Sequence, residues 1–216
     1  MTVIVVIMII FARKRATADR ALAEQLGFTP QAKIDPLLHS KVQALYRISG
    51  NTKLYNVSQK TTPDEMVYLC DISYESAHSD SGEVEYRTVC IVNPRLNLPS
   101  FLMMYQFDQV YGKMGNIING LLDKAIGMTG LQEIDFPAHP RFAAKYRVFS
   151  YQPESVKRIF SASLLDNLAD TENWLVRAEG DCFCFNTYAM RRGNEITQEQ
   201  LSRHIRDALQ FSYWIS

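Results

Sequence analysis

The chain begins with an unbroken apolar run that ends at three basic residues. The apolar residues are Val3, Ile4, Val5, Val6, Ile7, Met8, Ile9, Ile10 and Phe11, and the basic residues are Arg13, Lys14 and Arg15. Clustered Lys and Arg after an apolar run are typical of the cytoplasmic end of a membrane-spanning helix. We therefore expect residues 1–15 to anchor the chain in the inner (cytoplasmic) membrane through contacts with lipids. The rest of the chain is then expected in the cytoplasm, attached by a single membrane pass.

The run is short for a membrane span, and this leaves alternatives open. Ten helical residues rise about 15 Å, half of a hydrocarbon core of about 30 Å. A signal peptide places its positive charge before the apolar segment, whereas here the charge follows it. A buried core helix is disfavoured because the run has no polar face. The remaining interpretations are a transmembrane helix whose start lies upstream, or one that spans a locally thinned bilayer.

Charge is distributed unevenly along a chain that is neutral overall. Residues 13–60 carry nine Lys or Arg and three acids, whereas residues 61–216 carry fourteen basic and twenty acidic residues. A basic region beside an anchor is attracted to anionic head groups, and an acidic distal region is not. A nucleic-acid surface needs a higher pI than 6.9 and interleaved aromatic residues, so no nucleic-acid partner is expected.

Composition predicts a folded domain after the anchor. Hydrophobic residues make up 47% of the chain, including eleven Phe and eleven Tyr, which is enough for a sizeable core. We divide the chain into a membrane anchor at 1–15, a basic juxtamembrane helical region at 16–50 and a soluble α+β domain at 51–216.

The clearest local signal is a β-hairpin formed by residues 65–75 and 83–93, two β-rich runs around a polar loop that contains Gly82. Its alternation places Val67 and Leu69 on one face and Tyr68 and Cys70 on the other. Before it, helix formers between residues 13 and 26 end at Gly27, and Asp35-Pro36 opens a helix that runs to about Tyr46.

The last third of the chain alternates between strand and helix patterns. We expect a strand over 144–151, helices that begin near 153 and 161, and a hairpin of 174–178 with 182–188. Thr197 and Gln200 form a capping box that opens a final helix. The pattern of residues 94–132 does not decide whether they are ordered. Their glycines lack the spacing of a phosphate-binding loop.

These elements predict an α+β fold, in which an N-terminal membrane helix is followed by antiparallel β-hairpins packed with helices. The residues expected in the core are Val67, Leu69, Val89, Ile91, Val148, Ile159, Leu165, Leu175 and Ile205.

The sequence contains no residue spacing that is typical of a known catalytic motif. His139, near Asp135, is the best candidate for a general base, and both are functional candidates, yet a turn histidine with a structural role is the preferred interpretation. The carboxylates of the first hairpin are expected to form only a solvated face; they are Asp71, Glu75, Glu83 and Glu85. No catalytic residue, cofactor or metal ligand is predicted.

The four cysteines are expected to be small buried hydrophobic residues. Cys70 and Cys90 lie symmetrically about the loop of the first hairpin, and Cys182 and Cys184 share one face of a strand. Neither pair has the spacing of a zinc or redox site, and thiols in a cytoplasmic domain stay reduced.

One segment of the chain resembles a known group. Asp135-Phe136-Pro137-Ala138-His139-Pro140-Arg141-Phe142 is followed by Tyr146-Arg147-Val148 and a Glu-Ser-Val-Lys-Arg helix. This order resembles uncharacterised bacterial membrane-anchored proteins, the galanin-like layout of the DUF3137 family. The motif covers about 133–168, and the similar layout covers roughly 53–216. The resemblance implies an anchored domain and carries over no site residue.

Three function classes remain, in order of preference. The first is a membrane-anchored interaction or scaffold module that binds a protein partner at the inner membrane. The second is a binding module for a lipid or another apolar ligand, with Phe, Tyr and Met as the pocket lining; it requires a cavity of about 300 Å³ or more. The third is an uncharacterised enzyme.

Overall fold

The computed structural model describes residues 17–47, 52–75, 83–107, 126–127, 129–190 and 196–216. The predicted anchor residues 3–11 and the basic residues 13–15 lie outside this range. Within the range, none of the helices has both the length and the apolarity that a membrane crossing requires.

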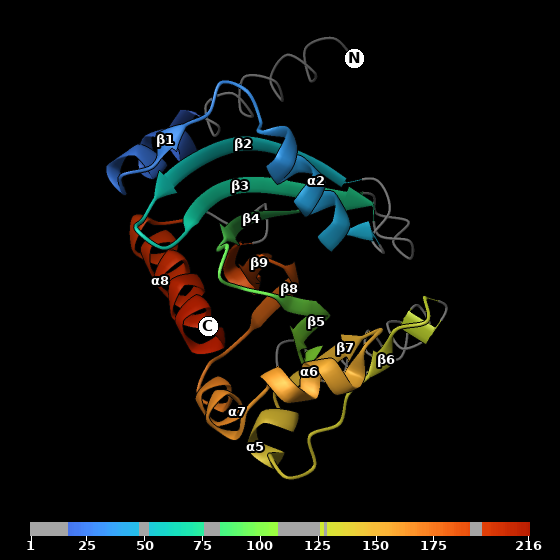
Figure 1. Cartoon of the computed structure of the whole chain (residues 1–216). Coiled ribbons are helices and arrows are strands. Elements are labelled where there is room, and N and C mark those ends of the chain that lie inside the picture. Colours follow the sequence, from blue (N-terminus) through green and yellow to red (C-terminus); the bar gives the residue numbers. More distant parts are fainter. Residues whose placement is uncertain (1–16, 48–51, 76–82, 108–125, 128, 191–195) are drawn as a thin grey trace, which may run out of the picture.

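The fold is α+β, as the sequence predicts, and it is built on one antiparallel sheet (Figure 1). The sheet has nine strands in the order β1-β2-β3-β4-β9-β8-β5-β7-β6. The strands are β1 Thr29–Pro30, β2 Thr52–Thr61, β3 Met66–Glu75, β4 Glu83–Val92, β5 Leu98–Tyr105, β6 Gln132–Glu133, β7 Tyr146–Ser150, β8 Trp174–Gly180 and β9 Cys182–Thr187.

Both predicted hairpins are confirmed. Strand β3 pairs with β4, with Val67 opposite Ile91 and Leu69 opposite Val89. Strand β8 pairs with β9, with Val176 opposite Phe185. The two hairpins then join edge to edge, because β4 pairs with β9. This places residues 90 and 184 side by side, a long-range pairing that no local pattern predicts.

The helices that follow Asp35, Gln152, Ser161 and Thr197 begin where the sequence predicts, whereas the short helix after His139 was not predicted. They are α2 Pro36–Leu45, α5 Pro140–Ala143, α6 Pro153–Ile159, α7 Ala162–Ala169 and α8 Gln198–Ile215, with a 3₁₀ turn η2 at Tyr188–Met190. Asp35 caps α2, Ser161 caps α7, and Thr197 with Gln200 forms the expected capping box of α8. Residues 17–25 are helical, and Gly27 follows them at φ +82°, which supplies the predicted stop.

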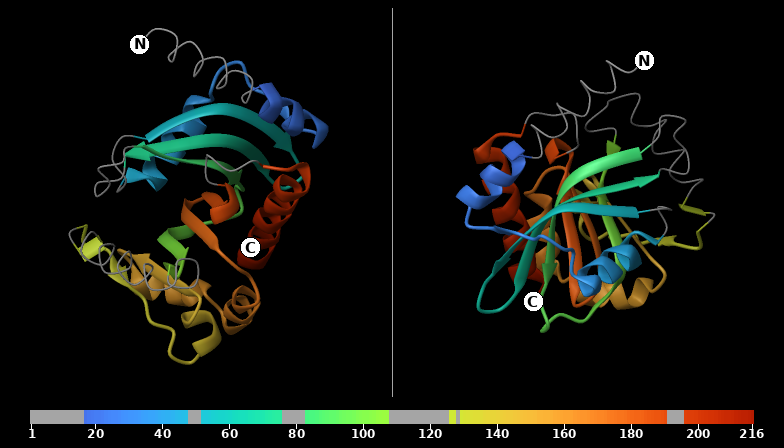
Figure 2. Two further views of the ribbon diagram at one scale, coloured as in Figure 1. Left: turned by 180° about the vertical axis from the view of Figure 1, so that it is seen from behind. Right: turned by 90° about the horizontal axis from the view of Figure 1, so that it is seen from above.

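Helices cover both faces of the sheet, and α2 and α8 lie on opposite sides of it (Figure 2). On the α8 face, Val67, Leu69, Val89 and Ile91 pack with residues from the helices. On the α2 face, the alternate residues of the same strands pack beneath α2. The sheet is therefore the middle layer of three, which explains why both faces of the first hairpin are apolar in sequence.

Most of the predicted core is buried. Val67, Leu69, Val89, Ile91, Val148, Leu165 and Leu175 are buried. Ile159 and Ile205 are only partly buried, because they pack on the edge of the cluster of the α8 face.

Residues 17–47 are part of this three-layer structure. Ala23 of the first described helix is fully buried on the α8 face, β1 pairs with β2, and α2 covers the opposite face. The Lys60 ammonium donates a hydrogen bond to the Leu26 carbonyl at 3.1 Å, which ties the end of the first helix to β2. The segment that follows the basic residues is thus held against the sheet.

Candidate functional site

A charged side chain lies beneath α2 in the middle of an otherwise apolar strand. Arg177 alternates along β8 with Val176 and Ala178, which point to the α8 face, so the strand register directs it to the α2 face. It is only 9% exposed. Its guanidinium carbon is 4.6 Å from the ring centroid of Tyr46 at the end of α2 and 5.8 Å from that of Tyr74 on β3.

Tyr46 is fixed from the other side by a chain of buried polar groups. The Asn186 side-chain amide donates a hydrogen bond to the Tyr46 hydroxyl at 3.2 Å. The Thr88 hydroxyl donates to the Asn186 side-chain carbonyl at 2.8 Å. Burial raises the pKa of Tyr46 well above its ordinary value, Cys184 adds to this effect, and the charge of Arg177 opposes it. Tyr46 is therefore a neutral, positioned ring against which the guanidinium stacks.

A second arginine forms the rim of this cluster. Arg47 follows Tyr46, and its Nη2 donates a hydrogen bond to the Ser100 hydroxyl at 3.0 Å and lies 3.3 Å from Glu179 Oε2. Its guanidinium carbon also lies 5.5 Å from the Tyr151 ring centroid. We call Arg47, Ser100 and Arg177 the arginine cluster.

A small hollow connects the members of the arginine cluster. Its volume is about 10 Å³, and its remaining walls include Leu45, Leu102 and Leu131. This volume admits about one water molecule. The hollow is too small for an acyl chain, whereas ligand pockets measure roughly 300–1,000 Å³.

Arg177 has no carboxylate partner among the described residues, and its Nε forms no hydrogen bond there. Cation–π contacts contribute on the order of 2 kcal/mol each when they are desolvated. Removal of a charged group from water costs several kcal/mol. The tyrosine rings therefore offset only part of the cost of burying this cation.

The opposite face shows how the same chain treats a similarly buried arginine. Arg87 on β4 is 5% exposed, and its Nη1 lies 2.9 Å from Oδ1 of Asp71 on β3. Asn56, in a left-handed conformation at a β-bulge of β2, donates a hydrogen bond to Asp71 Oδ2 at 2.7 Å. Asp71 is thus not part of a solvated carboxylate face, as the sequence interpretation held. The bulge and Arg87 bring it into the interior, paired.

His204 of α8 is buried near Arg87. Among the described residues, neither ring nitrogen has a partner at hydrogen-bond distance and angle. The centroid of the His204 ring lies 5.1 Å from that of the Phe185 ring. Burial lowers the pKa of His204 to about 3; the Arg87 backbone opposes this shift, and the charge of the Arg87 side chain adds to it. His204 is therefore neutral at physiological pH and acts as a core residue.

The cysteines are buried on the α2 face, as predicted. The Cys70 and Cys90 sulfurs are 3.6 Å apart, and the Cys90 and Cys184 sulfurs are 2.9 Å apart. Burial raises the pKa of Cys90 well above its ordinary value. A buried thiol of this kind is a weak nucleophile. Among the described residues, no group of three or more His, Cys, Asp or Glu has the arrangement of a metal site.

The two candidates that the sequence singled out do not meet. His139 precedes α5, and its Nδ1 lies 3.5 Å from Oδ1 of Asp166 on α7 instead of contacting Asp135. Asp135 is exposed. The backbone amide of His139 donates to the Phe136 carbonyl at 2.9 Å, which closes the turn before α5.

Sequence reasoning did not single out Arg177 or Tyr46. The available signal was Arg177 itself, a charged residue inside the apolar run Trp174–Ala178. Its partner could not be identified, because the tyrosine that covers it lies more than a hundred residues earlier in the chain.

A second hollow of about 360 Å³ lies at the edge of β1 and β2. It is open to solvent and lined by polar groups of Thr29, Gln31, Gln59, Lys60 and Thr61 together with Gly27. Its walls are unsuited to an apolar ligand.

Comparisons with known proteins show the fold. No family model matches the chain, and no curated protein matches its sequence. The structure is similar to the crystal structure of the mycobacterial trehalose monomycolate transport factor A, TtfA, with a TM-score of 0.56 and 10% sequence identity. The likeness covers 93% of each chain.

Proposed function

We propose that this chain is a membrane-anchored interaction module that binds a protein partner at the inner face of the cytoplasmic membrane. The observation that carries the proposal is the close packing among the residues that the structure describes. Apolar side chains close both faces of the sheet, and the hollow beneath α2 measures only about 10 Å³. A protein partner would contact such a packed region through its surface.

The attachment of the first described helix supports the membrane part of the proposal. Ala23 is buried in the core, Leu22 and Leu26 pack against it, and Lys60 caps the helix end. A membrane anchor at residues 1–15 would therefore join a helix that is packed on the sheet. The domain would be held at the bilayer by a short connection.

The α2 face is the proposed contact surface. Leu37 on α2 is 58% exposed, whereas Leu38, Val42 and Leu45 of the same helix are buried. The arginine cluster lies at the other end of the same helix. A partner on this face would contact both an apolar side chain and a cationic rim.

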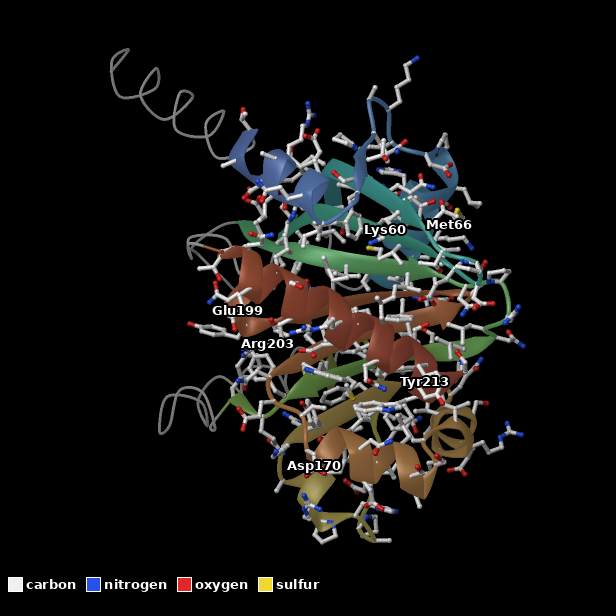
Figure 3. The ribbon with its side chains drawn as sticks, turned by 90° about the vertical axis from the view of Figure 1, so that its left-hand side faces the viewer. Lys60, Met66, Asp170, Glu199, Arg203 and Tyr213 are labelled. Carbon is white, nitrogen blue, oxygen red and sulfur yellow. The ribbon has the colours of Figure 1, made fainter. Side chains whose placement is uncertain are left out.

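Site-specific photocrosslinking in native membranes tests this proposal. A photoreactive residue at position 37 of the full chain should yield one discrete adduct with a partner protein. Position 213 is the matched control, because Tyr213 is 79% exposed on the outer side of α8 (Figure 3) and should yield none. Absence of an adduct at position 37, or equal adducts at both positions, would contradict the proposal.

A lipid-binding module is the second candidate, and the fold likeness favours it. The similar structure is that of a protein named for the transport of trehalose monomycolate. A lipid carrier accelerates the transfer of fluorescent lipid between two vesicle populations. If the chain is an interaction module, adding the full chain should leave the rate of lipid transfer between the vesicles unchanged. A faster transfer would favour the second candidate.

A further inference from the structure

The guanidinium of Arg177 lies over two aromatic rings and forms no ion pair among the described residues. It stacks on Tyr46 and lies near Tyr74, and its Nε has no hydrogen-bond partner. A buried guanidinium is stable where a carboxylate accepts hydrogen bonds from its planar fork. Among the described residues no carboxylate forms an ion pair with Arg177; Glu179, two residues along the same strand, pairs with Arg47 instead, and its buried Oε2 has no hydrogen-bond partner.

Arg87 provides an internal comparison. It is buried to a similar extent on the opposite face, and there the chain supplies Asp71 at 2.9 Å and Asn56 to hold Asp71 in place. The chain thus pairs one buried arginine internally and leaves the other facing a hollow. This difference points to an external partner for Arg177.

The surroundings of the hollow define what that partner can be. Arg47 lines the rim and contacts Ser100 and Glu179; because Glu179 Oε2 is a buried atom without a hydrogen-bond partner, this ion pair is costly to break. The walls between the two arginines include Leu45, Leu102 and Leu131. A group that fits must carry one negative charge at its tip and hydrocarbon behind it.

We propose that Arg177 and Arg47 bind the carboxylate of a small apolar acid. One carboxylate oxygen enters the hollow and accepts from Arg177, while the other accepts from a further N–H of Arg47, which stays paired with Glu179. The Ser100 hydroxyl donates to the same oxyanion. The hydrocarbon portion stays outside the hollow, at its mouth, because the hollow is too small for it. This binding does not require the membrane anchor or the proposed protein partner, although that partner would contact the same cationic rim.

Inorganic phosphate is a poorer fit for the same site. The hollow admits about one oxygen-sized group, and apolar walls disfavour a tetrahedral, strongly hydrated anion. A planar carboxylate matches the guanidinium fork and brings its own apolar surface. The site should therefore prefer hexanoate to acetate and acetate to phosphate.

Nuclear magnetic resonance of the arginine side chains tests the proposal in the full chain. Hexanoate, acetate and phosphate are titrated at constant ionic strength, and the Nε–Hε signals are followed. The expected result is a saturable shift of the Arg177 signal with hexanoate, a weaker response to acetate and none to phosphate. The spectrum of Arg177→Lys identifies the signal, because that variant keeps the charge and loses the Nε–Hε group.

Two further variants keep the test decisive if a change at Arg177 prevents folding. Arg47→Gln should weaken hexanoate binding by about tenfold, because one charge-assisted hydrogen bond is lost. Arg147→Gln is the matched control. Arg147 does not line the hollow, and its Nη2 lies 2.6 Å from Glu133 Oε2. This variant should bind hexanoate as the unaltered chain does. The absence of saturable shifts, an equal response to phosphate, or equal losses in both variants would overturn the proposal.

Discussion

Arg87 and Asp71 lie opposite each other on β4 and β3, with Arg87 Nη1 2.9 Å from Asp71 Oδ1. Both side chains are less than 10% exposed. Because Asn56 donates a further hydrogen bond to the carboxylate, the pair is held in one geometry within the α8 face of the sheet.

Asp71→Leu should therefore destabilise the chain strongly. The substitution leaves Arg87 buried without its carboxylate, and loss of one partner of a buried pair costs about 3–5 kcal/mol. The double variant Asp71→Leu, Arg87→Met removes both charges and should recover most of this loss. Urea unfolding of the full chain measures the differences. Asp170→Leu is the control: it breaks an exposed pair with Arg141 and should cost less than about 1 kcal/mol.

His204 should make stability fall in acid. Burial lowers its pKa in the folded state to about 3, below the value of 6.5 expected in the unfolded chain. Between pH 3 and pH 6.5 the unfolded chain therefore binds one more proton than the folded chain. The contribution of neutral His204 to the free energy of unfolding is complete above pH 6.5 and is lost as pH falls toward 3. The expected slope from this residue is about 1.4 kcal/mol per pH unit at most.

The comparison of unfolding at pH 7.5 and 5.0 isolates this effect. His204→Phe places a ring against Phe185 without a titrating group, so its stability should depend less on pH than that of the unaltered chain. Asp207 on the same helix has a pKa raised by burial, which acts in the opposite sense in both proteins and cancels in the difference. Equal pH dependence in both proteins would contradict the assignment.

The capping box of α8 should contribute measurably to stability. Thr197 Oγ1 accepts from the Gln200 amide at 3.2 Å, and Gln200 Oε1 accepts from the Thr197 amide at 2.9 Å. Thr197→Ala should lower the free energy of unfolding by about 1 kcal/mol, whereas Thr197→Ser should be nearly neutral. Denaturant unfolding distinguishes the two variants, and equal losses would show that the hydroxyl is unimportant.

His139 should have a modest structural role. Its contact with Asp166 is at the surface, where such pairs contribute about 0–1 kcal/mol. His139→Ala should lower the thermal midpoint slightly and leave cellular function intact at normal protein levels. Unchanged stability with abolished function would place an active site there instead.

Local elements of this fold could be predicted because their signals are local. The alternation around Val67 and Leu69 defines one hairpin, and the Thr197–Gln200 spacing defines the start of α8. The pairing of β4 with β9 could not be predicted, since it joins Cys90 to Cys184 across 94 residues of sequence. Such pairings depend on the packing of the whole sheet.

The arginine cluster could be predicted only in part, for the same reason. The sequence shows Arg177 within an apolar strand, but its burial depends on how the end of α2 packs over β8. For Asp71 the sequence interpretation was wrong in the other direction, since it expected an exposed side chain where the structure has a buried one. A carboxylate on a hairpin is usually solvated, and only the bulge at Asn56 and the register with Arg87 reveal that it is buried.

The most direct test of the central proposal is the distribution of the chain between membrane and soluble fractions. The full chain, produced at low level in a bacterial host, should be found in the inner-membrane fraction and resist extraction by high salt. A chain without residues 1–12 should move to the soluble fraction with its folded domain intact, as judged by its unfolding transition. If the full chain remains in the soluble fraction and the deletion changes nothing, the proposal of a membrane-anchored module is wrong.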